Sequence, residues 1–148
     1  MASDVETNDL APETISLSQR PGRVLVAEDN PINLKMLVYY LSTLEIAFDA
    51  VGSGREVLDA LALSDYDLIL MDCLMPDLDG YEATARIRQE ARAEVRDIPI
   101  IGVTSQSAHN DEHRCRAVGM NDYLAKPLRL KSLEGILDKW LPIRRPQD

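Results

Sequence analysis

The sequence is poor in cysteine and in aromatic residues. Its 148 residues include two cysteines, one tryptophan and one phenylalanine. Two cysteines cannot build the disulfide framework of a small secreted domain. Cys73 and Cys115 also stand far apart in the sequence and form no metal-ligand motif. We therefore expect a reducing compartment and ordinary packing roles for both thiols.

Long apolar runs and a basic leader are missing as well. No apolar stretch approaches the roughly 20 residues of a membrane span. The first residues lack the basic start and apolar core of a secretory signal. These absences predict a cytoplasmic protein with no membrane insertion.

Positive charge is scarce relative to negative charge. Lys and Arg number 16 against 25 Asp and Glu, which gives a net charge of −9. Non-specific binding of nucleic acid needs a cationic face, so we expect no direct nucleic-acid partner. The apolar content of 45% and the length suit one globular domain with a substantial core.

Composition divides the chain into three parts. Residues 1–21 are polar, acidic and without periodicity, which predicts a disordered leader. Pro21-Gly22 marks the start of the domain, which we expect over residues 22–141. Residues 142–148 then form a short C-terminal tail.

Within the domain, short apolar runs alternate with amphipathic stretches. The runs predict five strands, at residues 23–27, 46–50, 68–71, 98–103 and 122–125. A helical pattern follows each strand. Alternation at this spacing implies a parallel sheet with helices on both faces. In such sheets ligands bind at the carboxyl ends of the strands.

The helix after the central strand is expected to extend from about Gly80 to Ala93. Four apolar residues recur at helical spacing on one side: Tyr81, Ala83, Ile87 and Ala91. Three arginines occupy other positions and predict a solvated face with glutamate neighbours: Arg86, Arg88 and Arg92.

Chemically active side chains follow four of the predicted strands. Glu28 and Asp29 follow the first, Asp72 the third, Thr104 the fourth and Lys126 the fifth. Three carboxylates on one rim would repel and raise one another's pKa, and a hard cation such as Mg²⁺ relieves this. A strand-end carboxylate beside such a cation can attack phosphorus to give an acyl phosphate. Lys126 would counter the phosphoryl charge, and the Thr104 hydroxyl would donate to it.

Each of these residues alone has a simpler interpretation. Glu28 and Asp29 could cap a helix, Asp72 could favour the next turn, and Lys126 could be a solvated surface lysine. The Thr104 hydroxyl could bond its own backbone. Their convergence on one edge of the sheet favours chemistry.

The same residues resemble the motifs of a known family. The segments VLVAEDNP (24–31), LMDCLMPDLDG (70–80) and YLAKP (123–127), with Thr104, resemble the response-regulator receiver domain of two-component signalling. The resemblance extends over about residues 23–141. Segments 28–31, 79–84 and 117–123 are most similar to receivers of hybrid histidine kinases and phosphorelays.

The resemblance implies a fold and a phosphoacceptor. The fold is flavodoxin-like, a doubly wound (βα)5 parallel sheet of strand order 2-1-3-4-5. Asp72 is expected to accept a phosphoryl group from phosphohistidine. Mg²⁺ is expected on Glu28, Asp29, Asp72 and the backbone carbonyl of Leu74.

It also implies a switch. Thr104 and Tyr123 are expected to shift together and to change the face formed by the fourth helix, the fifth strand and the fifth helix. The Lys126–Pro127 bond is expected to be cis. A downstream protein target would read the changed face.

The first helix carries more apolar residues than one stripe needs. We expect Ile32, Met36 and Tyr40, with the loop at Pro127, to dock a histidine kinase or a histidine phosphotransfer protein. The alternative is that these residues pack under loops or stand exposed.

Leu74 is aliphatic where some members of the family carry a polar side chain that orients the hydrolytic water. We therefore expect slow self-dephosphorylation, and no enzyme activity beyond the protein's own phosphorylation and dephosphorylation. Two alternatives stay open. An aspartate-nucleophile phosphatase would want a second acid where Leu74 stands, and a degenerate receiver would act as an interaction scaffold.

Overall fold

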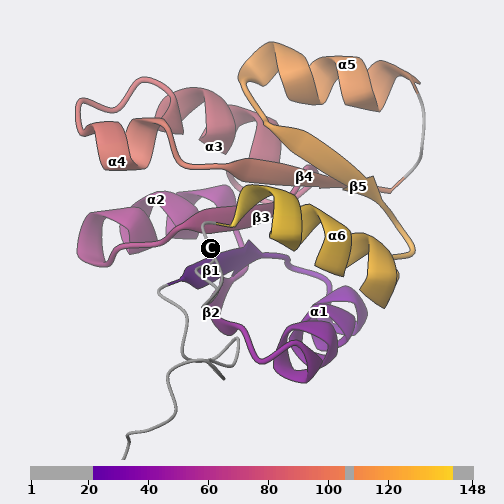
Figure 1. Ribbon diagram of the computed structural model, residues 1–148. Helices are drawn as coiled ribbons and strands as arrows, with labels where there is room; N and C mark the ends of the chain where they lie inside the picture. Colours follow the sequence, from indigo (N-terminus) through magenta and orange to yellow (C-terminus); the bar gives the residue numbers. More distant parts are fainter. Residues whose placement is uncertain (1–21, 106–108, 142–148) are drawn as a thin grey trace, which may run out of the picture.

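The five apolar runs form the strands of a fully parallel sheet. The strands are β1 (Arg23–Ala27), β2 (Ala47–Val51), β3 (Leu68–Asp72), β4 (Ile100–Thr104) and β5 (Asp122–Ala125). The computed structural model describes residues 22–105 and 109–141. Within them the strand order is β2-β1-β3-β4-β5, with every neighbouring pair parallel (Figure 1). The predicted fold class and strand order are confirmed, whereas the expected leader and tail lie outside the described residues.

Burial along the strands explains why the sequence pattern identified them. Every residue of β3 and β4 is buried, as a non-alternating apolar run requires. The edge strand β2 is only partly covered, and it exposes Asp49 and Ala50.

Helices cover both faces of the sheet. They are α1 (Pro31–Thr43), α2 (Gly54–Leu63), α3 (Gly80–Ile87), α4 (Ala93–Arg96), α5 (His109–Val118) and α6 (Leu130–Trp140). The buried apolar residues form two clusters, one on each face. One cluster packs α1 and α6 against the sheet, and the other packs α2, α3 and α5 (Figure 1). None of the helices in the described part of the chain has the length and apolarity to cross a membrane.

Two turns at the carboxyl edge of the sheet depend on particular residues. The Asn30 side chain caps α1, because its Oδ1 accepts from the backbone N–H of Ile32 at 2.9 Å and of Asn33 at 3.1 Å. At the start of α3, the Gly80 N–H donates to the Cys73 carbonyl at 3.0 Å. A Cβ at Gly80 would clash with the Asp72 carbonyl oxygen, so only glycine fits there. Both turns fix the chain next to a strand-end acid.

The prediction of one helix from Gly80 to Ala93 was wrong. Helix α3 ends at Ile87, and a separate short helix, α4, follows after an irregular connection. Ala91 is exposed, and Val95 supplies the buried contact instead. An apolar stripe at helical spacing therefore extended past the real end of the helix.

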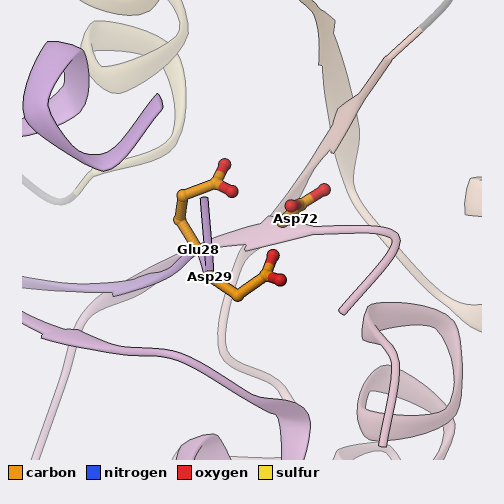
Figure 2. Close-up of side chains that lie close together, drawn as sticks. All are labelled: Glu28, Asp29 and Asp72. Atoms are coloured by element: carbon orange, nitrogen blue, oxygen red, sulfur yellow. The ribbon is translucent and has the colours of Figure 1, made fainter. Parts of the chain in front are cut away.

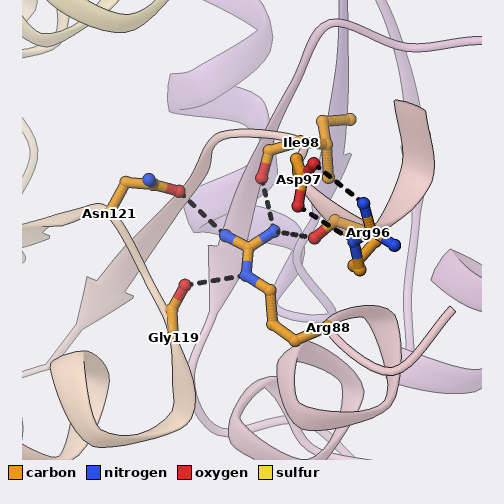
Figure 3. A network of polar contacts seen from close by, with 6 residues as sticks. All are labelled: Arg88, Arg96, Asp97, Ile98, Gly119 and Asn121. Atoms are coloured by element: carbon orange, nitrogen blue, oxygen red, sulfur yellow. Dashed lines mark hydrogen bonds and ion pairs between the residues drawn. The ribbon is translucent and has the colours of Figure 1, made fainter. Parts of the chain in front are cut away.

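Arg88 directly follows the last residue of α3, and its side chain points into the protein. The prediction that it lies on a solvated face was therefore also wrong. Its guanidinium donates to the carbonyls of Gly119 at 2.9 Å and of Arg96 and Ile98 at 2.7 Å each, and to Asn121 Oδ1 at 2.9 Å (Figure 3). Burial lowers the pKa of Arg88, although these carbonyl partners still suit a cation. One side chain thus joins the end of α3 to two later segments, residues 96–98 and 119–121.

Candidate functional site

The register of the sheet brings the strand ends together at one edge. Ala27 lies beside Met71, Asp72 beside Val103, and Thr104 beside Ala125. Glu28 and Lys126 each follow directly after one of these paired residues. The predicted rim of acids, hydroxyl and ammonium is therefore built by four neighbouring strands.

Lys126 lies between two of the acids. Its Nζ is 3.3 Å from Asp72 Oδ2 and 3.4 Å from Glu28 Oε1. Glu28, Asp29 and Asp72 each offer a carboxylate oxygen, and these oxygens lie within 4.8 Å of one another. Figure 2 shows the three side chains converging from the ends of two strands.

Two of the three acids are buried. Glu28 is 2% exposed and Asp72 is 5% exposed, whereas Asp29 faces solvent. Glu28 Oε2 accepts from the Asn30 N–H at 3.0 Å. Glu28 Oε1 has no hydrogen-bond donor among the described residues and lies 3.4 Å from the ammonium of Lys126. A buried carboxylate oxygen in this state is costly unless a cation neutralises it.

Asp72 has a strongly perturbed acidity. Burial, and then the neighbouring Glu28 carboxylate, raise the pKa of Asp72 from 3.8 to about 7. The Lys126 ammonium and the Leu74 N–H, which donates to Asp72 Oδ1 at 3.3 Å, act in the opposite direction. Lys126 alone therefore does not offset the effect of burial and of Glu28 on the ionised form of Asp72 near neutral pH.

These residues fit a divalent metal ion. The donor set is all oxygen, which hard cations such as Mg²⁺ prefer, and Glu28, one member of the set, is buried with one carboxylate oxygen that accepts no hydrogen bond among the described residues. Asp29 is exposed, so a bound ion would remain open to water and to a further ligand. The described residues therefore include a preformed cluster that could bind a metal.

The predicted switch residues lie on two neighbouring strands, Thr104 at the end of β4 and Tyr123 on β5. Thr104 is 2% exposed, and its carbonyl accepts from the Lys126 N–H at 2.7 Å. The Tyr123 hydroxyl donates to Glu112 Oε1 on α5 at 3.1 Å. This hydrogen bond raises the pKa of Tyr123. Glu112 was not identified from the sequence, because nothing in a local pattern links it to a tyrosine on the next strand.

The residues predicted to bind a partner differ in exposure. Ile32 is 72% exposed, Pro127 is exposed and Met36 is partly exposed. Tyr40 is half-buried, and its hydroxyl donates to the Leu128 carbonyl at 3.1 Å. The Lys126–Pro127 bond is cis, as the resemblance implied.

Two exposed apolar side chains were not assigned to the docking surface from the sequence. Tyr39 on α1 is 67% exposed, and Leu74, two residues after Asp72, is 61% exposed. From the sequence, Leu74 was assigned only a backbone carbonyl as a metal ligand and the lack of a polar side chain to orient the hydrolytic water. Its side chain is therefore apolar surface close to Asp72 in the sequence.

Comparisons with known proteins agree with this geometry. Residues 24–138 match the response regulator receiver domain family. The chain is 35% identical over 126 residues to the sensor histidine kinase GacS of Pseudomonas protegens. The alignment covers 84% of this chain but only 14% of that protein. It is 34% identical over 125 residues to hybrid signal transduction histidine kinase B of Dictyostelium discoideum. That alignment covers 78% of this chain and 6% of the relative.

A solved structure shows the same fold with a bound metal. The receiver domain of the sensor histidine kinase PA1611 from Pseudomonas aeruginosa is 39% identical, with a TM-score of 0.74 over 80% of this chain and 96% of that one. That structure has a magnesium ion coordinated in its active site cleft.

An α/β sheet of this order with an acidic, lysine-bearing carboxyl edge is consistent with a phosphoacceptor signalling domain. The chain belongs to the response regulator receiver domain family, and its curated relatives include hybrid histidine kinases. It spans only a small fraction of the length of those relatives.

Proposed function

We propose that Asp72 accepts a phosphoryl group from a phosphohistidine, with Mg²⁺ held by Glu28, Asp29, Asp72 and the Leu74 carbonyl. The observation that carries the proposal is the position of Asp72, buried at a strand end with Lys126 Nζ 3.3 Å from its Oδ2. The receiver unit that does this would extend over residues 22–141. Its own phosphorylation and dephosphorylation would be the only reactions that it catalyses.

The side chains divide the reaction between them. The Asp72 carboxylate attacks phosphorus, and the bond from phosphorus to the donor imidazole nitrogen breaks. Lys126 remains paired to Glu28, so its ammonium stays at the rim when Asp72 becomes an acyl phosphate. Thr104 would donate its hydroxyl to a phosphoryl oxygen. A bound Mg²⁺ would supply the remaining charge compensation for the carboxylates and the phosphoryl group.

The donor would dock beside this rim. We propose that Ile32, Met36, Pro127 and the Leu74 side chain form an apolar collar for a histidine kinase or a histidine phosphotransfer protein. Tyr40 would contribute only its exposed part. A receiver of known structure that is 29% identical to this chain, that of the yeast regulator Ssk1, was solved together with the phosphotransfer protein Ypd1, with a TM-score of 0.74. Such a relay module would operate in the cytoplasm.

Phosphorylation of Asp72 would be signalled to other proteins through Thr104 and Tyr123. When Thr104 moves toward the phosphoryl group, we expect Tyr123 to break its bond with Glu112 and turn inward. The helices predicted as the fourth and fifth are α5 and α6 here, so the changed face is α5-β5-α6. A downstream protein target would distinguish the two positions of Tyr123.

The test compares wild type with Asp72→Ala. Each is incubated with acetyl phosphate or beryllofluoride, with and without Mg²⁺. A base-labile adduct that needs both Mg²⁺ and Asp72 supports the proposal. Sustained hydrolysis of varied phosphate esters would favour the phosphatase. An absence of any adduct at saturating donor would favour the scaffold.

A further inference from the structure

The two cysteines are distant in the sequence but lie in contact in the fold. Cys73 directly follows Asp72, and Cys115 lies on α5. Their Sγ atoms are 3.8 Å apart. Both are free thiols, and they are 2% and 1% exposed. The ordinary packing expected from the sequence is therefore also a close approach of two thiols.

Gly102 on β4 makes this approach possible. A Cβ at that position would lie 3.1 Å from Cys115 Sγ, 3.4 Å from Cys73 Sγ and 2.6 Å from Met120 Sδ. Three sulfur atoms thus surround the space that a larger residue would fill. Because α5 packs directly on this strand, Cys115 is held against the loop that follows Asp72.

We propose that Cys73 and Cys115 are an oxidation site that forms a reversible intramolecular disulfide. A disulfide bond is about 2.05 Å long, so the two sulfur atoms must approach by about 1.8 Å from their 3.8 Å separation. Rotation about the Cα–Cβ bonds with a small shift of α5 would supply this movement. In a reducing compartment such a bond would be transient and regulatory rather than structural.

The reaction balances with a peroxide as the oxidant. One thiol sulfur attacks a peroxide oxygen, the O–O bond breaks, and a sulfenic acid and water form. The second thiol then attacks the sulfenic sulfur, and the S–S bond replaces the S–O bond with loss of a second water. Overall, two thiols lose two electrons and two protons, and hydrogen peroxide becomes two waters. A dithiol reductant reverses the bond by exchange.

Burial decides the kinetics of this reaction. Both thiols are covered, so peroxide reaches them only when α5 opens locally. Once the first sulfur is oxidised, its partner is already in contact. The sulfenic acid should therefore be too short-lived for a trapping reagent to capture.

The bond would also affect the phosphoacceptor, a consequence that rests on the proposed function. It would tie the residue after Asp72 to α5, which also carries Glu112, the partner of Tyr123. The oxidised protein would then resist the inward turn of Tyr123. We expect it to bind beryllofluoride about five-fold or more weakly, the lower end of ordinary coupling between sites.

The experiment treats the folded protein with hydrogen peroxide and maps the thiols by mass spectrometry without reduction. The expected product is monomeric, lacks about 2 Da and contains a Cys73–Cys115 peptide pair that dithiothreitol separates. Mapping of wild type needs no variant, and Cys115→Ala should accumulate a trappable sulfenic acid instead. Sulfinic or sulfonic acids, disulfide-linked dimers, or a bond that forms only in urea would overturn the proposal.

Beryllofluoride binding separates the disulfide from the proposed function. Binding to the reduced protein tests the phosphoacceptor alone, and peptide mapping tests the disulfide alone. Equal affinity of the reduced and oxidised forms would refute the link between them. Cys115→Ala, which cannot form the bond, should keep its affinity after peroxide treatment.

Discussion

Replacing Asp72 by asparagine should stabilise the protein at pH 8 in the absence of divalent cations. Burial and the Glu28 carboxylate raise the pKa of Asp72 from 3.8 to about 7, so at pH 8 the ionised side chain opposes folding. A rise of this size corresponds to an upper limit of about 4 kcal/mol. Asparagine keeps the oxygen that accepts from the Leu74 N–H but loses the attraction of Lys126. We therefore expect a net gain of about 1–2 kcal/mol, or about 2–8 °C in Tm.

The pH dependence of wild type has a defined sign. Because the pKa of Asp72 is raised in the folded state, the folded protein binds more protons than the unfolded chain between about pH 4 and pH 7. The stability that neutral Asp72 contributes is complete below about pH 4 and is lost as the pH rises through about 7. The loss is at most about 1.4 kcal/mol per pH unit, and Asp72→Asn should lack it. Urea unfolding at several pH values measures the free energy of unfolding of wild type and of Asp72→Asn.

Magnesium and a control variant complete this test. Mg²⁺ at 100 times its Kd should stabilise wild type by about 2.7 kcal/mol and should stabilise Asp72→Asn much less. Asp29→Asn changes an exposed acid of the same cluster and should raise Tm far less at pH 8. Lower stability of Asp72→Asn than of wild type at pH 8 without Mg²⁺, or equal stabilisation of both proteins by Mg²⁺, would contradict this prediction.

Four further changes test other parts of the account. Met36→Asp should slow phosphoryl transfer from a protein donor about ten-fold by burying a charge in the apolar collar, with acetyl phosphate as the unaffected control. Leu74→Asn should shorten the phosphoryl lifetime several-fold, because a polar side chain can orient water; an unchanged lifetime contradicts this. Glu112→Gln should weaken the hold on Tyr123 and increase beryllofluoride affinity a few-fold, measured by titration. Arg88→Met should cost about 3 kcal/mol in urea unfolding, because it leaves buried carbonyls unpaired, and a loss below about 1 kcal/mol would count against that role.

The sequence predicted the sheet and the rim well because both depend on local signals. Unbroken apolar runs such as β3 identify strands buried on both faces. The rule that parallel strands end at a common edge then placed Glu28, Asp72 and Lys126 together without any knowledge of their distances. The start of α1 also depends on a local interaction, because Asn30 caps the helix through its own side chain.

The features that were missed depend on contacts between distant segments. The end of α3 is set by Arg88, whose partners include Gly119 and Asn121, more than thirty residues later. The contact between Cys73 and Cys115 requires the packing of α5 against Gly102. The periodicity of a single helix carries no information about contacts with distant segments, so these contacts could not be predicted from sequence patterns.

The hydrogen bond from Tyr40 to the Leu128 carbonyl joins α1 to the segment that carries Lys126. Leu128 lies two residues beyond Lys126, so we expect a displacement of α1 to move the backbone that carries the ammonium. Recognition of a donor and alignment of the lysine would then be a single movement. Tyr40→Phe would uncouple them, and it should slow transfer from a protein donor while the rate with a small-molecule donor stays the same.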